Sequence, residues 1–376
     1  MTKPDDLLPE GLEDRLPQSA ETITRVMRVA LDVLGSHGYD RVRPPLVEFE
    51  KSLVGRMAGH EQDAHPRRMF RFVDPSSLRT LALRSDITPQ IGRIAATSLA
   101  DAPRPLRLCY CGETAVMRAD QLDPARERLQ LGAELIGADT VNAAAEMVAL
   151  AVDALAAAGL NGISVDFTLP DLVDILSQDA MPLVPDAVDA VRRELDTKDA
   201  GGLKAAGGEA YLPLLYATGP LDDALESLRA IDAGGALASR IAGLEAIAKR
   251  IGGADNGGPR ITLDPTERHG FEYQSWFGFT LYADGVRGAV GRGGTYKIKG
   301  SEEVATGFSL FVEVLASAAF ELSQPDTLYL PEGHDDDAAA RLRTIGWRTI
   351  AQIGADEDAV ALGCTHRLDG KEPIRL

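Results

Sequence analysis

The fold is decided by residues 81–137, which open with LALRSDITPQIGRIA (81–95) and close with LRLCYCGETAVMRADQLDPARERLQLGAELIG (106–137). The pattern predicts a strand running into a helix, then two more strands. Arg84, Asp86 and Thr88 fall on the strand-to-helix corner, where Thr88 is expected to be the N-cap. Gln130 and Glu134, four residues apart on a strand, are expected to share one face of the sheet.

These side chains have the chemistry of a site for an amino-acid-like ligand. Asp86 could pair with an α-ammonium group, and Glu134 could accept a hydrogen bond from an imidazole or another donor. The alternative that spacing leaves open is that they are surface residues and caps.

Outward from this stretch, strands and helices alternate without an internal repeat. The main segments are a helix at 21–34, a strand at 163–169, a hairpin around Asp284-Gly285, and a strand running into a helix at 307–322. This order predicts an α+β fold in which an antiparallel sheet is flanked by helices.

Changes in the helix and strand patterns along the sequence predict four segments. Residues 1–170 and 254–324 form two parts of one core, and residues 171–253 form a helical insertion with Gly-rich breaks. Residues 325–376 are expected to form a small α/β appendage with the order β-α-β-β.

Composition bounds the possible functions. The chain has 376 residues with 45% hydrophobic residues, enough for a sizeable core, and its formal net charge is −18. An acid excess argues against binding nucleic acid through its phosphates. There is no membrane-length apolar run or signal-peptide pattern. The three cysteines and scattered histidines offer no disulfide framework or metal site, so we expect a cytoplasmic protein without cofactors.

Six motifs occur in the order found in histidyl-tRNA synthetases, and the chain resembles that family over roughly residues 9–320. The resemblance implies a class II synthetase-like fold, usually dimeric, with Pro45 at the dimer interface. The motifs are RPPLVE (43–48), LALRSDITPQIGRIA, LCYCGE followed by RLQLGAELIG, HGFEYQSWFGF (269–279), GRGGTY (291–296) and GFSLFVE (307–313).

The resemblance also shows departures at the ATP positions. The arginines that hold ATP in the synthetases fall on Val116 and Val314, and the histidine-specific catalytic arginine falls on His269. Arg118 stands where the synthetases have an acid. Phosphate chemistry needs fixed cationic donors, which valine cannot supply. The chain is therefore not expected to form an aminoacyl adenylate.

The positions that contact histidine in the synthetase family are largely retained. The matching residues are Asp86 (Glu in the family), Thr88, Gln130, Glu134, Tyr273 and Tyr296. Gln274 and Thr295 depart from the pattern. Loss of the ATP groups with retention of the histidine groups indicates a binder of histidine. The alternative is that the retained polar residues now satisfy one another in a closed core.

Both sets of changes fit the regulatory subunits of ATP phosphoribosyltransferase, which are paralogues of the synthetases. This resemblance implies a non-catalytic chain that activates a short catalytic ATP phosphoribosyltransferase subunit. It also implies histidine feedback on the first step of histidine biosynthesis. The implied assembly is a homodimer within a hetero-oligomer that binds neither nucleic acid nor membrane.

Two other functions stay open from the sequence. One is a divergent histidyl-tRNA synthetase or another class II activating enzyme, and the other is a stand-alone histidine-binding adaptor. The sequence also leaves open whether histidine occupies the synthetase-like pocket or a subunit interface.

Overall fold

The computed structural model describes residues 7–54, 69–118, 124–232, 234–253, 257–268, 274–298, 301–318 and 326–376. The chain divides into two compact units, residues 1–320 and 321–376. Within the described ranges, no helix combines the length and the apolar character needed to cross a bilayer.

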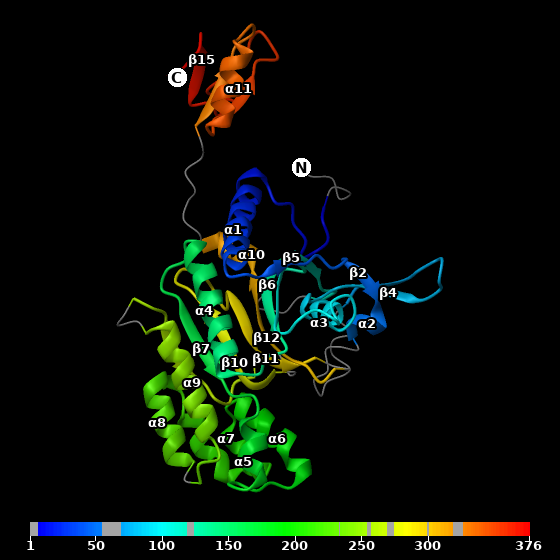
Figure 1. Ribbon diagram of the computed structural model, residues 1–376, viewed down its shortest axis with the longest axis vertical. Helices are drawn as coiled ribbons and strands as arrows, with labels where there is room; N and C mark the ends of the chain where they lie inside the picture. The colour runs from blue at the N-terminus through cyan, green and yellow to red at the C-terminus, as the bar shows by residue number, and fades with distance from the viewer. Residues whose placement is uncertain are drawn as a thin grey trace. The chain divides into compact units, whose positions relative to one another are not determined.

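A nine-stranded sheet is the centre of the first unit (Figure 1). Its six inner strands, from β5 to β7, pair antiparallel, which confirms the expected fold class. Two parallel pairings, β1 with β5 and β7 with β9, make the whole sheet mixed. The order is β1 (Asp40–Arg41), β5 (Leu106–Ala115), β6 (Glu127–Ile136), β12 (Val304–Phe311), β11 (Gly291–Lys297), β10 (Gln274–Tyr282), β7 (Ser164–Thr168), β9 (Arg260–Leu263) and β8 (Gly219–Pro220).

One face of this sheet is covered by α1 (Pro17–Ser36), α4 (Val141–Ala157) and α10 (Val312–Ala318) (Figure 1). The odd-numbered apolar residues of β6 point to these helices, and Leu131 and Ala133 are fully buried among them. We call this side the α1 face. Its apolar burial is the main force holding helices to sheet.

The opposite face carries α3 (Thr88–Ala96), and we call it the α3 face (Figure 1). Ile91 of α3 packs in a second apolar cluster with Tyr110 and Ile136. Beside α3 lies a three-stranded sheet with a short helix, made of β2 (Val47–Phe49), β4 (Thr80–Leu83), β3 (Arg71–Val73) and α2 (Glu50–Val54).

The prediction that Thr88 caps α3 is wrong by one position. Ile87 is the N-cap, and Thr88 is the first helical residue. Oδ1 of Asp86 accepts a hydrogen bond from the Thr88 N–H at 3.0 Å, so an aspartate supplies the acceptor that a capping hydroxyl would offer.

The segment expected to be a helical insertion carries five α-helices, a 3-10 helix and strand β8. Its apolar residues, Val191 and Leu244 among them, belong to the same cluster as the α1 face of the sheet. The elements are α5 (Leu172–Gln178), α6 (Pro185–Asp196), α7 (Ala200–Ala205), η2 (Glu209–Tyr216), α8 (Leu221–Ile231) and α9 (Ala238–Ile251).

The second unit is a four-stranded sheet with one helix and its own small core around Leu328 and Leu342. Its strand order is β14-β13-β15-β16. The expected β-α-β-β order omits its last strand, because a turn at Gly370, with φ of +57°, folds the chain end back onto β15. The elements are β13 (Thr327–Leu330), α11 (Asp336–Thr344), β14 (Arg348–Ala351), β15 (His366–Asp369) and β16 (Glu372–Arg375).

Candidate functional site

The corner between β4 and α3 is fixed by Arg84, whose side chain is buried. Its Nε donates to the carbonyl of Glu113 at 2.7 Å, and its Nη1 donates to that of Pro44 at 2.9 Å. Gly112 is required beneath it, because a Cβ there would overlap the guanidinium. Burial lowers the pKa of Arg84. This arginine therefore acts as a brace that positions Asp86 and Thr88.

A buried carboxyl group, that of Glu134 on β6, lies at the centre of the α3 face. The residue is 1% exposed. Oε2 accepts a hydrogen bond from the Tyr296 hydroxyl at 2.9 Å. Oε1 lies 3.2 Å from the Thr88 hydroxyl and 3.3 Å from that of Tyr110. Strands β5, β6 and β11 and helix α3 thus each contribute a polar group to one point.

Gln130 links this carboxyl group to the β4–α3 corner. Its Nε2 donates to Oδ1 of Asp86 and to Oγ of Ser309, both at 2.7 Å. Its Oε1 accepts from the Ile87 N–H at 2.9 Å. We call the set Asp86, Thr88, Tyr110, Gln130, Glu134, Tyr296 and Ser309 the Glu134 cluster.

One hydrogen-bond acceptor of the Glu134 cluster has no donor among the described residues. Oδ2 of Asp86 is buried and has no hydrogen-bond partner among the residues that the structure describes. A buried acceptor without a partner costs free energy, since it has lost water and gained nothing. A ligand that brings a donor to this oxygen would recover that cost.

Burial controls the charge of the cluster. It raises the pKa of Glu134 to about 8, an effect that the Tyr296 hydrogen bond opposes and the Asp86 charge reinforces. Burial, followed by the Glu134 charge, also raises the pKa of Tyr110. In the described part of the chain no ion pair reaches Asp86 or Glu134. Two acids without a counter-cation form a site for a cationic or hydrogen-bond-donating ligand.

Glycines continue the row of Glu134 across the sheet. Gly307 on β12 pairs with Glu134, Gly294 on β11 pairs with Gly307, and Gly278 on β10 pairs with Gly294. A Cβ at Gly307 would overlap the Glu134 carboxyl group. The register therefore places a strip of backbone without side chains beside the carboxyl group.

The structure brings together five of the six residues expected to bind histidine. These are Asp86, Thr88, Gln130, Glu134 and Tyr296; the sixth, Tyr273, lies outside the described residues. Hydrogen bonds among the five mean that they partly satisfy one another, and Asp86 Oδ2 is the exception. Sequence reasoning missed Tyr110 and Ser309. Both pair across the sheet with Gly132, between Gln130 and Glu134, and only the register between strands places them there.

The positions expected to have lost ATP contacts lie apart from the cluster. Val116 directly follows β5 and is half-buried, and its N–H donates to the Arg126 carbonyl. Val314 packs against the apolar residues of the α1 face. Arg118 is exposed, and His269 lies outside the described residues. Pro45 is exposed, and its carbonyl accepts from Nε2 of Gln90 at 2.8 Å.

The sequence is similar to histidyl-tRNA synthetases and to ATP phosphoribosyltransferase regulatory subunits. The sequence model described as Histidyl-tRNA synthetase matches residues 11–315. A Rhodospirillum centenum protein named ATP phosphoribosyltransferase regulatory subunit is 40% identical, over 96% of this chain and 94% of its own. A Paramagnetospirillum magneticum protein of the same name is 39% identical, over 96% of each chain.

Solved structures show the same fold. A Bacillus halodurans structure, described as an ATP phosphoribosyltransferase regulatory subunit/histidyl-tRNA synthetase, superposes with a TM-score of 0.80 at 25% identity. The match covers 96% of this chain and 97% of that one. Histidyl-tRNA synthetase from Nostoc shares the fold with a TM-score of 0.76 at 16% identity, over 97% of this chain and 91% of its own.

Proposed function

Because the chain belongs to the family of ATP phosphoribosyltransferase regulatory subunits, we propose that it binds histidine in the Glu134 cluster and thereby inhibits its catalytic partner. As a regulatory subunit, the chain leaves catalysis to that partner. The regulated reaction joins ATP to phosphoribosyl pyrophosphate, the first step of histidine biosynthesis.

The observation that carries the proposal is the buried, unpartnered Oδ2 of Asp86. An α-ammonium group donates up to three hydrogen bonds and carries the charge that the acid lacks. With that group at Asp86, the imidazole points toward Glu134 and Tyr296. Tyr273, the sixth residue of the prediction, is also expected to contact histidine.

Histidine acts in this proposal by shifting the assembly toward a less active arrangement, which requires that it bind one arrangement more tightly than another. The chain forms a homodimer through the segment around Pro45, and the dimer joins a short catalytic subunit. The complex is cytoplasmic, where three free thiols, Cys109, Cys111 and Cys364, stay reduced. An acidic chain of net charge −18 has no transfer-RNA role.

The test is to purify the chain with its catalytic partner and measure phosphoribosyl-ATP formation with and without histidine. We expect the chain to raise the partner's activity and histidine to lower it. No change in activity on adding the chain would refute the regulatory role. Histidine-dependent ATP–pyrophosphate exchange by the isolated chain would favour a synthetase instead.

A matched pair of variants separates activation from feedback. Asp86→Asn keeps the size of the side chain but removes the charge that pairs with the ammonium group, so it should still activate the partner and resist histidine. Asp101→Asn, at an exposed position, should behave as wild type. Full histidine inhibition of Asp86→Asn would contradict the proposed position of the ligand.

A further inference from the structure

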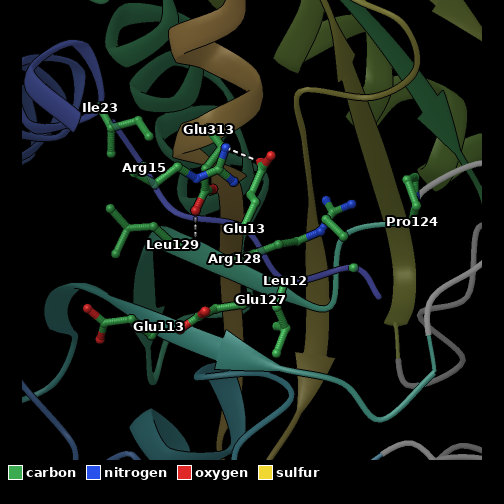
Figure 2. A pocket seen from close by; sticks show the side chains of 12 residues that line it. Leu12, Glu13, Arg15, Ile23, Glu113, Pro124, Glu127, Arg128, Leu129 and Glu313 are labelled. Atoms are coloured by element: carbon green, nitrogen blue, oxygen red, sulfur yellow. Dashed lines mark hydrogen bonds and ion pairs between the residues drawn. The ribbon is translucent and has the colours of Figure 1, made fainter. Parts of the chain in front are cut away.

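A second site lies on the α1 face, behind the Glu134 cluster. A pocket of about 480 Å³ opens between the N-terminal segment, the paired ends of β5 and β6, and the first turn of α10 (Figure 2). Gly11, at φ of +76°, forms part of the wall and packs closely against Pro124, because a Cβ at Gly11 would overlap the Pro124 carbonyl oxygen. The Arg126 N–H also donates to the Gly11 carbonyl, so this wall is anchored.

The pocket is acidic. Four glutamates line it, Glu13, Glu113, Glu127 and Glu313, against the two arginines Arg15 and Arg128. Arg15 is already ion-paired with Glu13 (Figure 2). The guanidinium of Arg128 lies over the Phe311 ring, 4.8 Å from its centroid. Carboxylates therefore outnumber the cations that could neutralise them.

Glu113 and Glu127 are exposed and lie on the same face of neighbouring strands. Their register, with Glu113 opposite Leu129 and Glu127 opposite Ala115, makes them diagonal neighbours. Like charges at this spacing repel unless a cation lies between them. Neither side chain has a hydrogen bond or an ion pair to a residue that the structure describes.

Glu313, in the lining of the pocket, has one oxygen that is hydrogen-bonded to a described residue and one that is not. Its Oε1 accepts from the Leu129 N–H at 2.6 Å. Its Oε2 is buried and has no hydrogen-bond partner in the described part of the chain. The free energy of such an oxygen falls when a donor reaches it.

Apolar side chains line the rest of the pocket. Leu12, Ile23 and Leu129 face the same space as the glutamates. A long basic side chain buries its methylene stem on such a surface and keeps its charged head among carboxylates. The pocket thus fits an arginine or a lysine.

We propose that this pocket receives an arginine or lysine side chain from the catalytic partner subunit. A second copy of this chain, whose net charge is −18, is a poorer match to an acidic pocket. A small free cation in so open a site gains little, whereas a side chain carried on a docked surface adds to a larger interface. The inference rests on the existence of the catalytic partner, as the family assignment implies.

Strand β6 connects this pocket to the histidine site. Leu129 donates to Glu313 on the α1 face, and the next residue, Gln130, bonds Asp86 and Ser309 on the α3 face. Partner and effector would therefore contact consecutive residues of one strand.

The experiment measures binding of the full chain to the catalytic subunit by titration calorimetry at two salt concentrations. Glu113→Gln/Glu127→Gln keeps both side-chain shapes and removes both charges. We expect about ten-fold weaker binding at low salt and a smaller loss of affinity on adding salt. The control Glu209→Gln/Glu226→Gln removes two exposed charges in the helical segment and should bind as wild type.

Unchanged affinity of the Glu113/Glu127 variant, or an equal loss in the control, would overturn the inference. The inference would also be overturned if the Glu113/Glu127 variant bound the partner normally but no longer bound free arginine or spermidine. A change only in the self-association of this variant, measured by sedimentation, would overturn it as well. Failure of the wild-type chain to bind the partner would instead refute the proposed function. Histidine affinity of the isolated variant should be unchanged, which keeps the two proposals separate.

Discussion

The region around Glu134 and the region around Val116, at opposite ends of β5 and β6, differ in the chemistry of their side chains. Around Glu134, β5 and β6 carry buried polar groups held by hydrogen bonds of 2.7 to 3.3 Å. Just beyond the far end of β5, Val116, the residue that we propose replaces a phosphate-binding arginine, offers only a half-buried apolar side chain. A fold can lose one half of an active site and keep the other, because each half depends on its own side chains.

The largest expected difference between the two regions is in amino-acid activation. Histidine-dependent ATP–pyrophosphate exchange by the isolated chain should be at least about 10⁴-fold slower than that of an active histidyl-tRNA synthetase. The reason is that Val116 and Val314, which we propose replace two phosphate-binding arginines, supply no cationic donor. An active synthetase assayed in parallel is the positive control. If the wild-type chain does catalyse the exchange and Asp86→Asn abolishes it, the chain still activates histidine and the proposed difference between the two regions is wrong.

Gln130→Leu should damage the region around Glu134 most. The substitution leaves Asp86, Ser309 and the Ile87 N–H without their amide partner, so histidine affinity should fall about 100-fold and the free energy of unfolding by about 2 to 4 kcal/mol. Calorimetric titration and denaturant unfolding measure the two effects.

Gln90→Leu is the matched control for Gln130→Leu. Gln90 is an equally buried amide, but its partners, Pro45, Glu48 and Arg84, lie outside the cluster. It should lower stability while leaving histidine affinity within about three-fold of wild type, since it removes no group of the cluster. Equal losses of affinity in both variants would mean that stability, and not the site, sets binding.

Gly307→Ala tests the bare strip beside Glu134. The added methyl overlaps the carboxyl group, so histidine affinity should fall about ten-fold and stability by about 2 kcal/mol. Gly35→Ala, within α1 and open to space, should instead raise stability by about 0.5 to 1 kcal/mol. If Gly307→Ala changed neither histidine affinity nor stability, the absence of a side chain at position 307 would not be needed for the site.

The smallest expected effect concerns pH. The pKa of Glu134 is raised to about 8 from an unfolded value of 4.5, so its protonated form stabilises the fold fully below pH 4.5, and this contribution is lost as pH rises through 8. Gln cannot ionise. The melting temperature of Glu134→Gln relative to wild type should therefore rise by several degrees between about pH 5 and 8.5.

An exposed glutamate provides the control for this pH series. Glu226→Gln, at an exposed position of α8, should show no such trend. A flat difference for Glu134→Gln as well would show that Glu134 is ionised in the folded chain.

Much of the site was predictable because strands have a two-residue period. Gln130 and Glu134 share a face for that reason, and Asp86 follows from the strand-to-helix corner. Tyr110 and Ser309 were missed because a hydroxyl becomes part of a network only when strand order places β12 beside β6. The Thr88 cap was misplaced because the Thr88 hydroxyl donates to Glu134 on β6, a contact between distant segments, while Asp86 accepts from the Thr88 N–H.

The sequence by itself determined the fold class and the family, because these depend on residue type, spacing and order. Tertiary structure decided which groups change their pKa, which polar atoms are hydrogen-bonded and which buried polar atoms have no hydrogen-bond partner among the described residues. Burial raises the pKa of Glu134, and the packing of α3 and α10 against the sheet leaves one oxygen each of Asp86 and Glu313 without a described partner. Such properties arise from desolvation and from contacts between distant segments, which no local pattern encodes.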